Sequence, residues 1–194
     1  MSKLIFSVGY NTKETYKSTE NGKKTKCYQT WQNMLTRCYD EEFHVKKPAY
    51  IGCKVCEEWH NFQNFAKWYE GNYYEIEGER MHLDKDILIK GNNIYSPQTC
   101  VFVPQRINAL FEKCDRVRGN YPVGVHKDKN KFRAKIRTGH KLIYLGIFDN
   151  PHEAYLLYKI NKELLIQSVA EEYKDKIPKI LYEALINYNV EEND

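Results

Sequence analysis

The sequence lacks any apolar run long enough to span a membrane. Its opening stretch, residues 1–6, is too short to be a signal peptide. These absences predict a cytoplasmic protein. Low-complexity segments are also lacking, and 14% of the residues are aromatic, so we expect the chain to fold. Its 194 residues are enough for one or two small domains.

Paired cysteine motifs are scarce. The six cysteines of a cytoplasmic chain are expected to be thiols or metal ligands before disulfides. Cys53 and Cys56 have the spacing of a zinc knuckle, and Cys38 and Cys100 would complete four ligands. A second Cys-x-x-Cys pair is missing, so buried thiols packed against tryptophan are the simpler interpretation, with structural zinc as the alternative.

The net charge of +4 conceals a strong segregation along the chain. Residues 116–145 hold nine Lys and Arg against one Asp, whereas residues 148–194 hold five Lys against ten Asp and Glu. Concentrated positive charge is typical of a surface that binds a polyanion. The alternative is a solvated basic face without a partner.

Residues 131–137 alternate strictly between charged and apolar side chains. The charged set is Lys131, Arg133, Lys135 and Arg137, and the apolar set is Phe132, Ala134 and Ile136. Because side chains of a strand alternate between its two faces, this pattern predicts a half-buried strand with one cationic face. Turn signals at 128–130 and 138–139 separate it from strands at 123–127 and 141–148, so we expect a three-stranded antiparallel meander.

A helix is predicted directly after the meander. Asn150 is a capping residue, Pro151 suits the first helical position, and Glu153 follows three residues after the cap. The apolar positions at helical spacing are Ala154, Leu157, Tyr158, Leu164 and Leu165. We expect them to cover the apolar side of the sheet and leave the cationic side open for the major groove of DNA.

This stretch resembles the AP2 domain, the DNA-binding module of plant ethylene-response factors and of many phage proteins. The resemblance covers about a fifth of the chain. The matching residues are Gly124, Val125, the run 131–137, Tyr144, Leu145, Gly146, Phe148, Glu153, Ala154 and Tyr158.

The AP2 resemblance implies specific DNA contacts. Tyr144 replaces a DNA-contacting Trp, Arg137 and Lys135 occupy contact positions, and His126 stands where the family usually has Arg. Val123 and Asp128 replace further arginines of plant members, so affinity or target sequence should differ. The expected groove residues are Arg133, Lys135, Arg137 and Tyr144, and the expected phosphate contacts are His126, Lys127, Lys129 and Lys131.

The first 26 residues contain an Asn21-Gly22 pair and a lysine cluster at 23–26. They predict a short hairpin, an arm along phosphates, or a loosely ordered lead-in. Helices are expected at 28–39, 59–69 and 104–111, and short strands at 81–89 and 100–103. A basic linker at 113–120 marks the predicted domain boundary.

Residues 31–108 resemble a widespread phage family related to HNH endonucleases. The motifs that support the resemblance are Trp31, Met34, Arg37 and Cys38; Val55, Cys56, Trp59, Phe62 and Phe65; Leu83 to Asp86; Tyr95, Ser96, Pro97 and Cys100; and Val103 with Asn108. Phage members often place an AP2 domain behind such a unit, which implies a bacterial host cell as the location.

The HNH resemblance implies a ββα site in which a His activates water and one divalent cation offsets charge on the leaving oxygen. Asp84 and Asn108 occupy ligand positions and suit Mg²⁺, which takes oxygen ligands. Lys85 stands at the position of the catalytic His, and Thr99 replaces the middle Asn. A lysine with a pKa near ~10.4 is protonated at neutral pH, so it cannot act as the base.

His82 lies two residues before Asp84, so it faces the same side of a strand and is a candidate substitute base. The alternative is an ordinary surface histidine. Asp84 and Asp86 would form a carboxylate pair for metal, or else cap a turn or pair with Lys85 and Lys90.

The sequence therefore predicts an α+β protein with four segments. These are an arm at 1–26, an HNH-like ββα domain with flanking helices at 27–114, an AP2-like sheet and helix at 115–170, and an acidic helical tail at 171–194. The tail would pack back on the body, form a dimer contact, or shield the basic sheet. The expected function is sequence-specific binding of double-stranded DNA, with three alternatives: a Mg²⁺-dependent homing-type endonuclease, a non-catalytic regulator or repressor, and a phage factor that engages a host protein.

Overall fold

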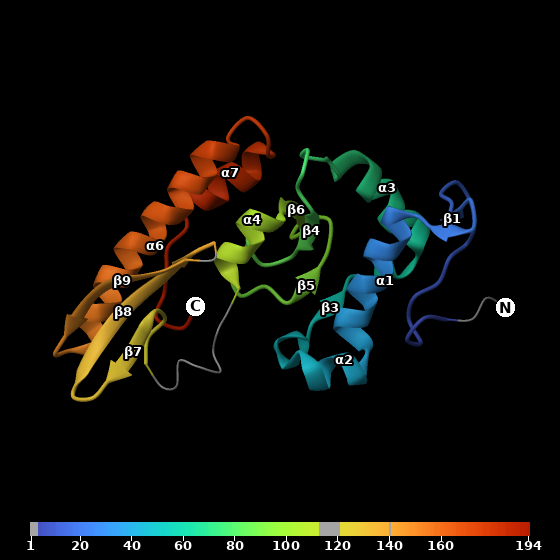
Figure 1. Cartoon of the computed structure of the whole chain (residues 1–194). Coiled ribbons are helices and arrows are strands. Elements are labelled where there is room, and N and C mark those ends of the chain that lie inside the picture. The colour runs from blue at the N-terminus through green and yellow to red at the C-terminus, as the bar shows by residue number, and fades with distance from the viewer. Residues whose placement is uncertain (1–3, 113–120, 140) are drawn as a thin grey trace. The chain divides into compact units, whose positions relative to one another are not determined.

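The computed structural model describes residues 4–112, 121–139 and 141–194 (Figure 1). It confirms the predicted mixture of helices and sheet. The chain divides into two compact units. Unit 1 comprises Met1–Glu75 and Leu83–Phe102, and unit 2 comprises Ile76–His82 and Val103–Asp194. The predicted linker at 113–120 lies outside the described residues.

Unit 1 is mostly helical, with short strands between the helices. Its elements are β1 (Thr19–Glu20), β2 (Lys23–Lys24), α1 (Lys26–Tyr39), α2 (Glu41–Lys46), the 3-10 turn η1 (Pro48–Tyr50), β3 (Lys54–Val55), the 3-10 turn η2 (Glu57–His60), α3 (Phe62–Asn72) and β5 (Ile94–Tyr95). Strand β4 (Met81–Asp84) pairs with β6 (Val101–Pro104), and the division between the units passes through both strands.

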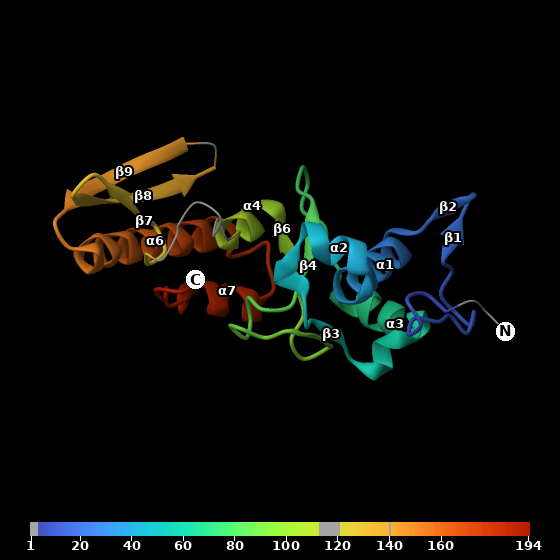
Figure 2. The ribbon, with the colours of Figure 1, turned by 90° about the horizontal axis from the view of Figure 1, so that it is seen from below.

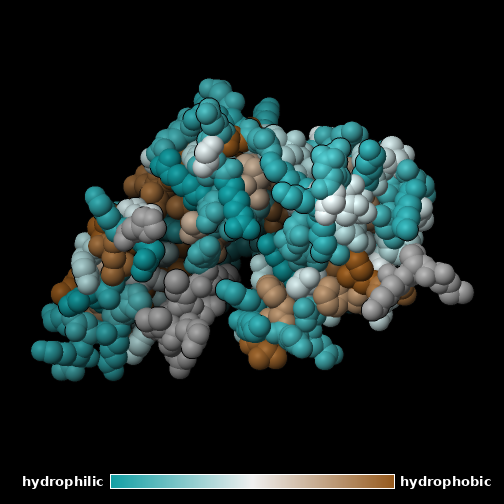
Figure 3. All heavy atoms as spheres, turned by 45° about the vertical axis from the view of Figure 1, so that its right-hand side comes forward, coloured by the Kyte–Doolittle hydropathy of each residue, from teal (hydrophilic) through white to brown (hydrophobic). Residues whose placement is uncertain are grey.

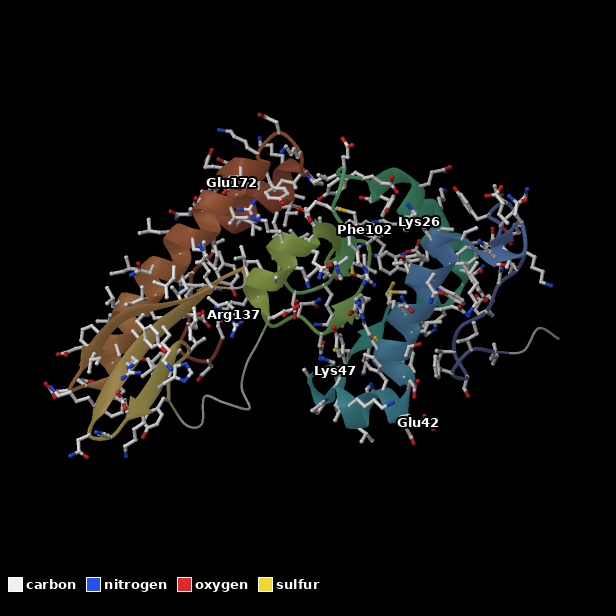
Figure 4. All side chains as sticks on the ribbon, viewed as in Figure 1. Lys26, Glu42, Lys47, Phe102, Arg137 and Glu172 are labelled. Carbon is white, nitrogen blue, oxygen red and sulfur yellow. The ribbon has the colours of Figure 1, made fainter. Side chains whose placement is uncertain are left out.

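The core of unit 1 is aromatic. Helix α1 forms as predicted, with its apolar positions Trp31, Met34, Leu35 and Cys38 all buried. The Trp31 indole donates to the carbonyl of Trp59 at 2.7 Å, so a polar group inside this core is satisfied. Phe102, labelled in Figure 4, packs edge-on against the ring of Tyr69 at 5.2 Å.

The second helix begins later than the sequence predicts. Residues 57–60 form a 3-10 turn, and α3 starts at Phe62 because the Asn61 side chain caps it by accepting from the backbone N–H of Gln63. The Gln63 side chain in turn accepts hydrogen bonds from the backbone N–H groups of Thr15 and Tyr16, at 3.0 and 2.8 Å. The segment before α1 is therefore tied to α3.

The N-terminal segment forms a hairpin, which is one of the three alternatives that its sequence left open. Strands β1 and β2 pair in antiparallel fashion, and Asn21 and Gly22 lie between them with φ of 49° and 74°. Positive φ at both central residues is the geometry that an Asn-Gly pair favours in a two-residue hairpin loop.

Unit 2 combines a sheet with helices. Its elements are α4 (Gln105–Asn108), the 3-10 turn η3 (Ala109–Phe111), β7 (Val125–Asp128), β8 (Lys131–Thr138), β9 (Lys141–Phe148), α6 (Pro151–Tyr173) and α7 (Lys179–Ile186). The strands form the predicted antiparallel meander in the order β7-β8-β9. Helix α6 lies against the sheet, and α7 packs on α6 (Figure 2).

The contact between sheet and helix explains the positions of two small residues. Ala134 on β8 and Ala154 on α6 are fully buried in it. Gly124 has φ of 76°, and a Cβ atom added there would lie 2.0 Å from the ring of Tyr158. Glycine is therefore required at 124 both for backbone conformation and for packing.

Helix α6 begins at the predicted cap, since the Asn150 side chain accepts from the backbone N–H of His152. It runs for 23 residues and so extends to Tyr173, beyond the predicted end of the AP2-like segment. The expectation that Leu164 covers the sheet is wrong, because Leu164 is 59% exposed. The helix extends beyond the end of the sheet, so its second half packs on other segments of unit 2.

One of those partners is the segment around α4. Arg106 forms an ion pair at 2.5 Å with Glu172, which is labelled on α6 in Figure 4, and its guanidinium lies over the ring of Tyr173, 5.7 Å from the centroid. The Tyr173 hydroxyl donates to Glu79. Residues 76–82 and α4 are thereby joined to the end of α6 within unit 2.

The acidic tail packs on α6. Leu181, Leu185 and Val190 are almost fully buried, and the Tyr155 hydroxyl donates to the carbonyl of Val190 at 2.9 Å. This confirms that the tail folds back on the body. Among the described residues, no helix is both long and apolar enough to cross a membrane.

Candidate nucleic-acid interface

Strand β8 separates its cations from its apolar residues. Ala134 is fully buried and Ile136 is 4% exposed on the side that contacts α6. The alternate residues therefore project from the side of the sheet that faces away from α6, which we call the open face. Its four cations are Lys131, Arg133, Lys135 and Arg137. Figure 4 labels Arg137 on β8.

Tyr144 lies between two of these cations. It is paired with Lys135 across the sheet and is 60% exposed. The Arg133 guanidinium lies 5.3 Å from its ring centroid and the Lys135 ammonium lies 5.5 Å away. Both distances suit cation–π attraction, so the aromatic ring and the two charges hold one another in place on the open face.

Two acidic residues border the cations. Asp128 forms an ion pair with Arg133, and Asp149 forms one with Lys131 at 3.1 Å. Exposed pairs of this kind contribute about 0–1 kcal/mol to stability. They are consequently weak enough for a phosphate to replace the carboxylate as the partner of the cation.

The remaining predicted contact residues occupy different positions. His126 lies opposite Arg133 on the open face, and its own burial and the charge of Lys135 lower its pKa. His126 is therefore neutral at neutral pH and offers hydrogen bonds rather than charge. Lys127 lies opposite Phe132, which assigns it to the side of the helix, although it is exposed. Lys129 is in the turn, with φ of 54°.

The open face also contains two aliphatic residues that sequence reasoning did not single out. Leu142 is paired with Arg137 and is 44% exposed, and Ile147 is paired with Arg133 and is 54% exposed. Strand β9 is apolar on both sides, so its composition does not reveal which residues face outward. A register shift between Ala134 and Lys135 places Leu145 opposite no residue of β8 and changes the alternation at that point.

The contacts of the acidic tail are with α6 and the chain before β7. The Val123 N–H donates to the carbonyl of Glu192 at 2.9 Å, and the Glu192 carboxylate contacts His152 at 3.2 Å. The Val190 N–H donates to Glu163 at 2.9 Å. These contacts place the tail beside the helix layer rather than on the cations of the open face.

The predicted catalytic carboxylate Asp84 ends strand β4 and caps a turn. Its Oδ1 accepts from the backbone N–H groups of Asp86 and Ile87, at 2.9 and 2.8 Å. Burial, and then the charge of Asp86, raise the pKa of Asp84 to about 6. The turn-capping alternative from the sequence is thus the arrangement that this structure contains.

Lys85, at the position of the HNH base, is held by its own turn. It is 8% exposed, and its ammonium donates to Asp86 at 2.9 Å and to the carbonyl of Asn92 at 3.1 Å. Burial lowers the pKa of Lys85, but the hydrogen bond and charge of Asp86 outweigh that effect, and the pKa is raised overall. The side chain is therefore a cation at neutral pH.

The other members of the predicted catalytic set have less distinctive surroundings. His82 precedes Asp84 on β4 and contacts the Gln105 side chain at 3.5 Å. Asn108 is partly buried and ends α4. Thr99 is structural, since its hydroxyl donates to the carbonyl of Ile94 at 2.7 Å and contacts the Ser96 hydroxyl at 2.9 Å. Asp84 and Lys85 belong to unit 1, and His82 and Asn108 to unit 2.

The four cysteines considered for zinc are thiols with raised pKa values. Burial raises the pKa of Cys38 and of Cys100 to about 12, and it also raises those of Cys53 and Cys56. As free thiols they are protonated at neutral pH, which is typical of inert structural cysteines. Within the described ranges, no three His, Cys, Asp or Glu side chains are grouped to hold a metal ion.

Comparisons of the chain with protein-family models, curated proteins and solved structures found no match.

Proposed function

We propose that unit 2 binds double-stranded DNA through the open face of its sheet, and that the protein acts as a sequence-specific DNA-binding regulator. The observation that supports this most directly is the arrangement of Lys131, Arg133, Lys135 and Arg137 on the side of β8 that faces away from α6. A row of cations on the side of a sheet that faces away from its packed helix matches the phosphate charge on both sides of a groove.

The chemistry of the face suits the major groove, which admits a β-ribbon. Arg133 and Arg137 have the fork geometry that binds guanine in bidentate fashion, with about 1–3 kcal/mol of discrimination for each good pair. Leu142 and Ile147 lie opposite these arginines and would contact thymine methyl groups. Lys131 and Lys135 would contact phosphates and set the orientation.

We further propose that unit 2 is an AP2-like module. Three features support the assignment: the strand order β7-β8-β9, the helix capped at Asn150, and Gly124 packed against Tyr158. Tyr144 then takes the role of the family's Trp. The HNH-like origin of residues 27–114 is also a proposal and is supported by the sequence motifs alone.

The surroundings of Asp84 and Lys85 favour regulation over catalysis. The Oδ1 atom of Asp84 caps a turn, and Lys85 is a buried cation bound to Asp86. Neither residue is arranged as a general base. The endonuclease alternative requires Mg²⁺ at Asp84 and a base at His82.

DNA binding is tested by titrating labelled duplex at several salt concentrations with the wild-type chain and a Lys135→Ala, Arg137→Ala double variant. We expect tight, salt-sensitive binding by the wild type. The double variant should bind at least about tenfold more weakly, with a salt slope reduced by roughly one, since each lost phosphate contact lowers the slope by about one and Lys135 is the phosphate contact of the two. A Lys174→Ala, Lys176→Ala variant removes the same charge at the end of α6 and should bind normally.

Equal losses in the two double variants would show that net charge, and not the open face, determines binding. If the wild type shows no salt-sensitive binding, the host-protein alternative becomes the better one. Incubation of plasmid with Mg²⁺ or Mn²⁺ tests the endonuclease. We expect binding without nicking, and nicking that disappears in Asp84→Ala would contradict the regulator proposal.

A further inference from the structure

The flank of unit 2 at β9 is apolar and exposed. Within the described ranges β9 pairs with β8 alone, so its outer edge is that of the sheet. Helix α6 adds an exposed stripe at four-residue spacing, in which Leu156, Ile160 and Leu164 are 43%, 55% and 59% exposed. Ile143 on β9 is 43% exposed. We call these four residues the apolar flank. Figure 3 shows brown, apolar surface on the left-hand side, where unit 2 lies.

The packing of α6 places the stripe beside β9. Tyr158 packs against Gly124, which lies just ahead of β7. Leu157 packs near Gly146 on β9, where an added Cβ atom would lie 3.6 Å from the Leu157 side chain. Rotation about the helix from Tyr158 to Leu157 therefore runs from the β7 side to the β9 side. Leu164 and Ile160 lie about 20° and 60° farther in the same direction.

Ile143 lies level with this stripe. It is three residues before Gly146 on the helix-facing side of β9, which is about 10 Å along a strand. Helix α6 runs antiparallel to β9, and about seven helical residues span the same 10 Å. Because Leu157 lies at the level of Gly146, Leu164 lies at the level of Ile143. The strand edge and the helix stripe thus form one continuous surface.

We propose that a second copy of this chain binds the apolar flank, with the two β9 strands pairing in antiparallel fashion to form a six-stranded sheet. A hydrophobic edge strand of eight residues is a template for strand addition. A two-fold axis normal to the sheet keeps both open faces on one side and brings both stripes together beneath the new strand pair. DNA does not compete for this surface, because an apolar flank offers a polyanion no partner.

The sequence of β9 is complementary to itself under that symmetry. Leu142 and Ile147 both lie on the open face, because the register shift at Leu145 changes the alternation between them. If Leu142 lies opposite Ile147 of the partner subunit, the two side chains therefore project from the same face of the joined sheet. The same register places Lys141 beside the end of β9 in the second copy, where it would share the Asp149 carboxylate with Lys131 of that copy. At the other edge of the sheet, Val123 is already bonded to Glu192.

Formation of the dimer does not depend on DNA binding. What the dimer implies for the DNA target rests on the proposed function. Two open faces on one side of a joined sheet would address two half-sites of one duplex. The target would then be a pseudo-palindrome, as two-fold protein symmetry requires.

Sedimentation equilibrium of the DNA-free full chain across a dilution series tests the proposal. We expect the wild type to approach twice the chain mass of 23.1 kDa. Ile160→Glu and Leu164→Glu should each raise the dissociation constant by at least about tenfold. Both side chains are exposed, so circular dichroism should show unchanged folding. Ile180→Glu on α7, where Ile180 is 57% exposed, is the matched control and should dimerise normally.

Hydrogen exchange supplies a second readout. Amides of β9 should exchange more slowly in the dimer, and Ile160→Glu should abolish that protection. A monomeric wild type overturns the proposal, as does a dimer that Ile180→Glu dissociates and Ile160→Glu does not. If the chain dimerises but binds no DNA, the proposed function fails and the interface remains.

Discussion

Asp128 forms an ion pair with Arg133, one of the four cations of the open face, across the hairpin that joins β7 and β8. Arg133 also lies over the ring of Tyr144, so its guanidinium is held between a carboxylate and an aromatic ring. The pair positions Arg133 but reduces the positive potential where a phosphate would bind. On the proposed function, Asp128 would therefore lower DNA affinity through its charge.

Replacing Asp128 by Asn should tighten DNA binding. The variant removes one negative charge from the open face and leaves Arg133 in contact with Tyr144. We expect affinity to rise by about three- to tenfold at low salt, with the gain shrinking as salt rises, since exposed charges are screened within about 10 Å at 0.1 M. Anisotropy titrations at two salt concentrations measure the effect. Weaker binding by the variant would mean that Asp128 is needed to orient Arg133.

The ring of Tyr144 should matter more than its hydroxyl. Tyr144→Phe retains the surface over which Arg133 and Lys135 lie, so its affinity should stay within about twofold of wild type. Tyr144→Ala removes the ring that positions Arg133 and Lys135, so DNA binding must then order both cations. That cost is at most the value of the two cation–π contacts, about 0.5–1 kcal/mol each at exposed sites, which corresponds to a loss of up to about tenfold. The same titrations compare the two variants, and equal losses would instead point to the hydroxyl.

Gly124 should be far less tolerant of substitution than Gly139. Both have positive φ, at 76° and 57°, but only at Gly124 does a Cβ atom meet a ring. We expect Gly124→Ala to lower the free energy of unfolding by about 2–4 kcal/mol and Gly139→Ala by about 1 kcal/mol. Urea denaturation of the two variants provides the comparison, and similar losses would argue against the packing role of Tyr158.

Asp84 should make stability depend on pH. Its pKa is raised to about 6 in the folded chain, from an ordinary value of 3.8. Between these values the folded chain retains a proton that the unfolded chain has lost. Stability should therefore fall as pH rises through this window, by about 1–3 kcal/mol, because each pKa unit corresponds to 1.36 kcal/mol.

The matched variant is Asp84→Asn, which retains an oxygen for the N–H groups of Asp86 and Ile87 and cannot ionise. We expect its melting temperature to exceed that of wild type at pH 7 and to equal it at about pH 3, below both pKa values. Thermal melts at both pH values measure this. If Mg²⁺ raises the melting temperature of wild type at pH 7 but not that of the variant, the result would support Mg²⁺ binding at Asp84.

Local patterns predicted much of unit 2 correctly. The alternation at 131–137, the turns on either side and the cap at Asn150 correspond to β8, its hairpins and the start of α6. The apolar face of α1 was also predicted correctly, since Trp31, Met34, Leu35 and Cys38 are all buried. Each of these features depends on residues close together in the chain, which is why the order of side chains was sufficient to specify them.

Contacts between distant segments decided the rest. The faces of β9 could not be assigned from its uniformly apolar sequence, because pairing with β8 and the shift at Leu145 set them. The exposure of Leu164 depends on where the sheet ends above α6, and the position of the acidic tail depends on the bond between Val123 and Glu192. The residue order specified strands, turns and caps through short-range sterics and hydrogen bonds. Which surfaces remain open was settled only when the elements packed, because burial is a property of neighbours that lie far apart in the chain.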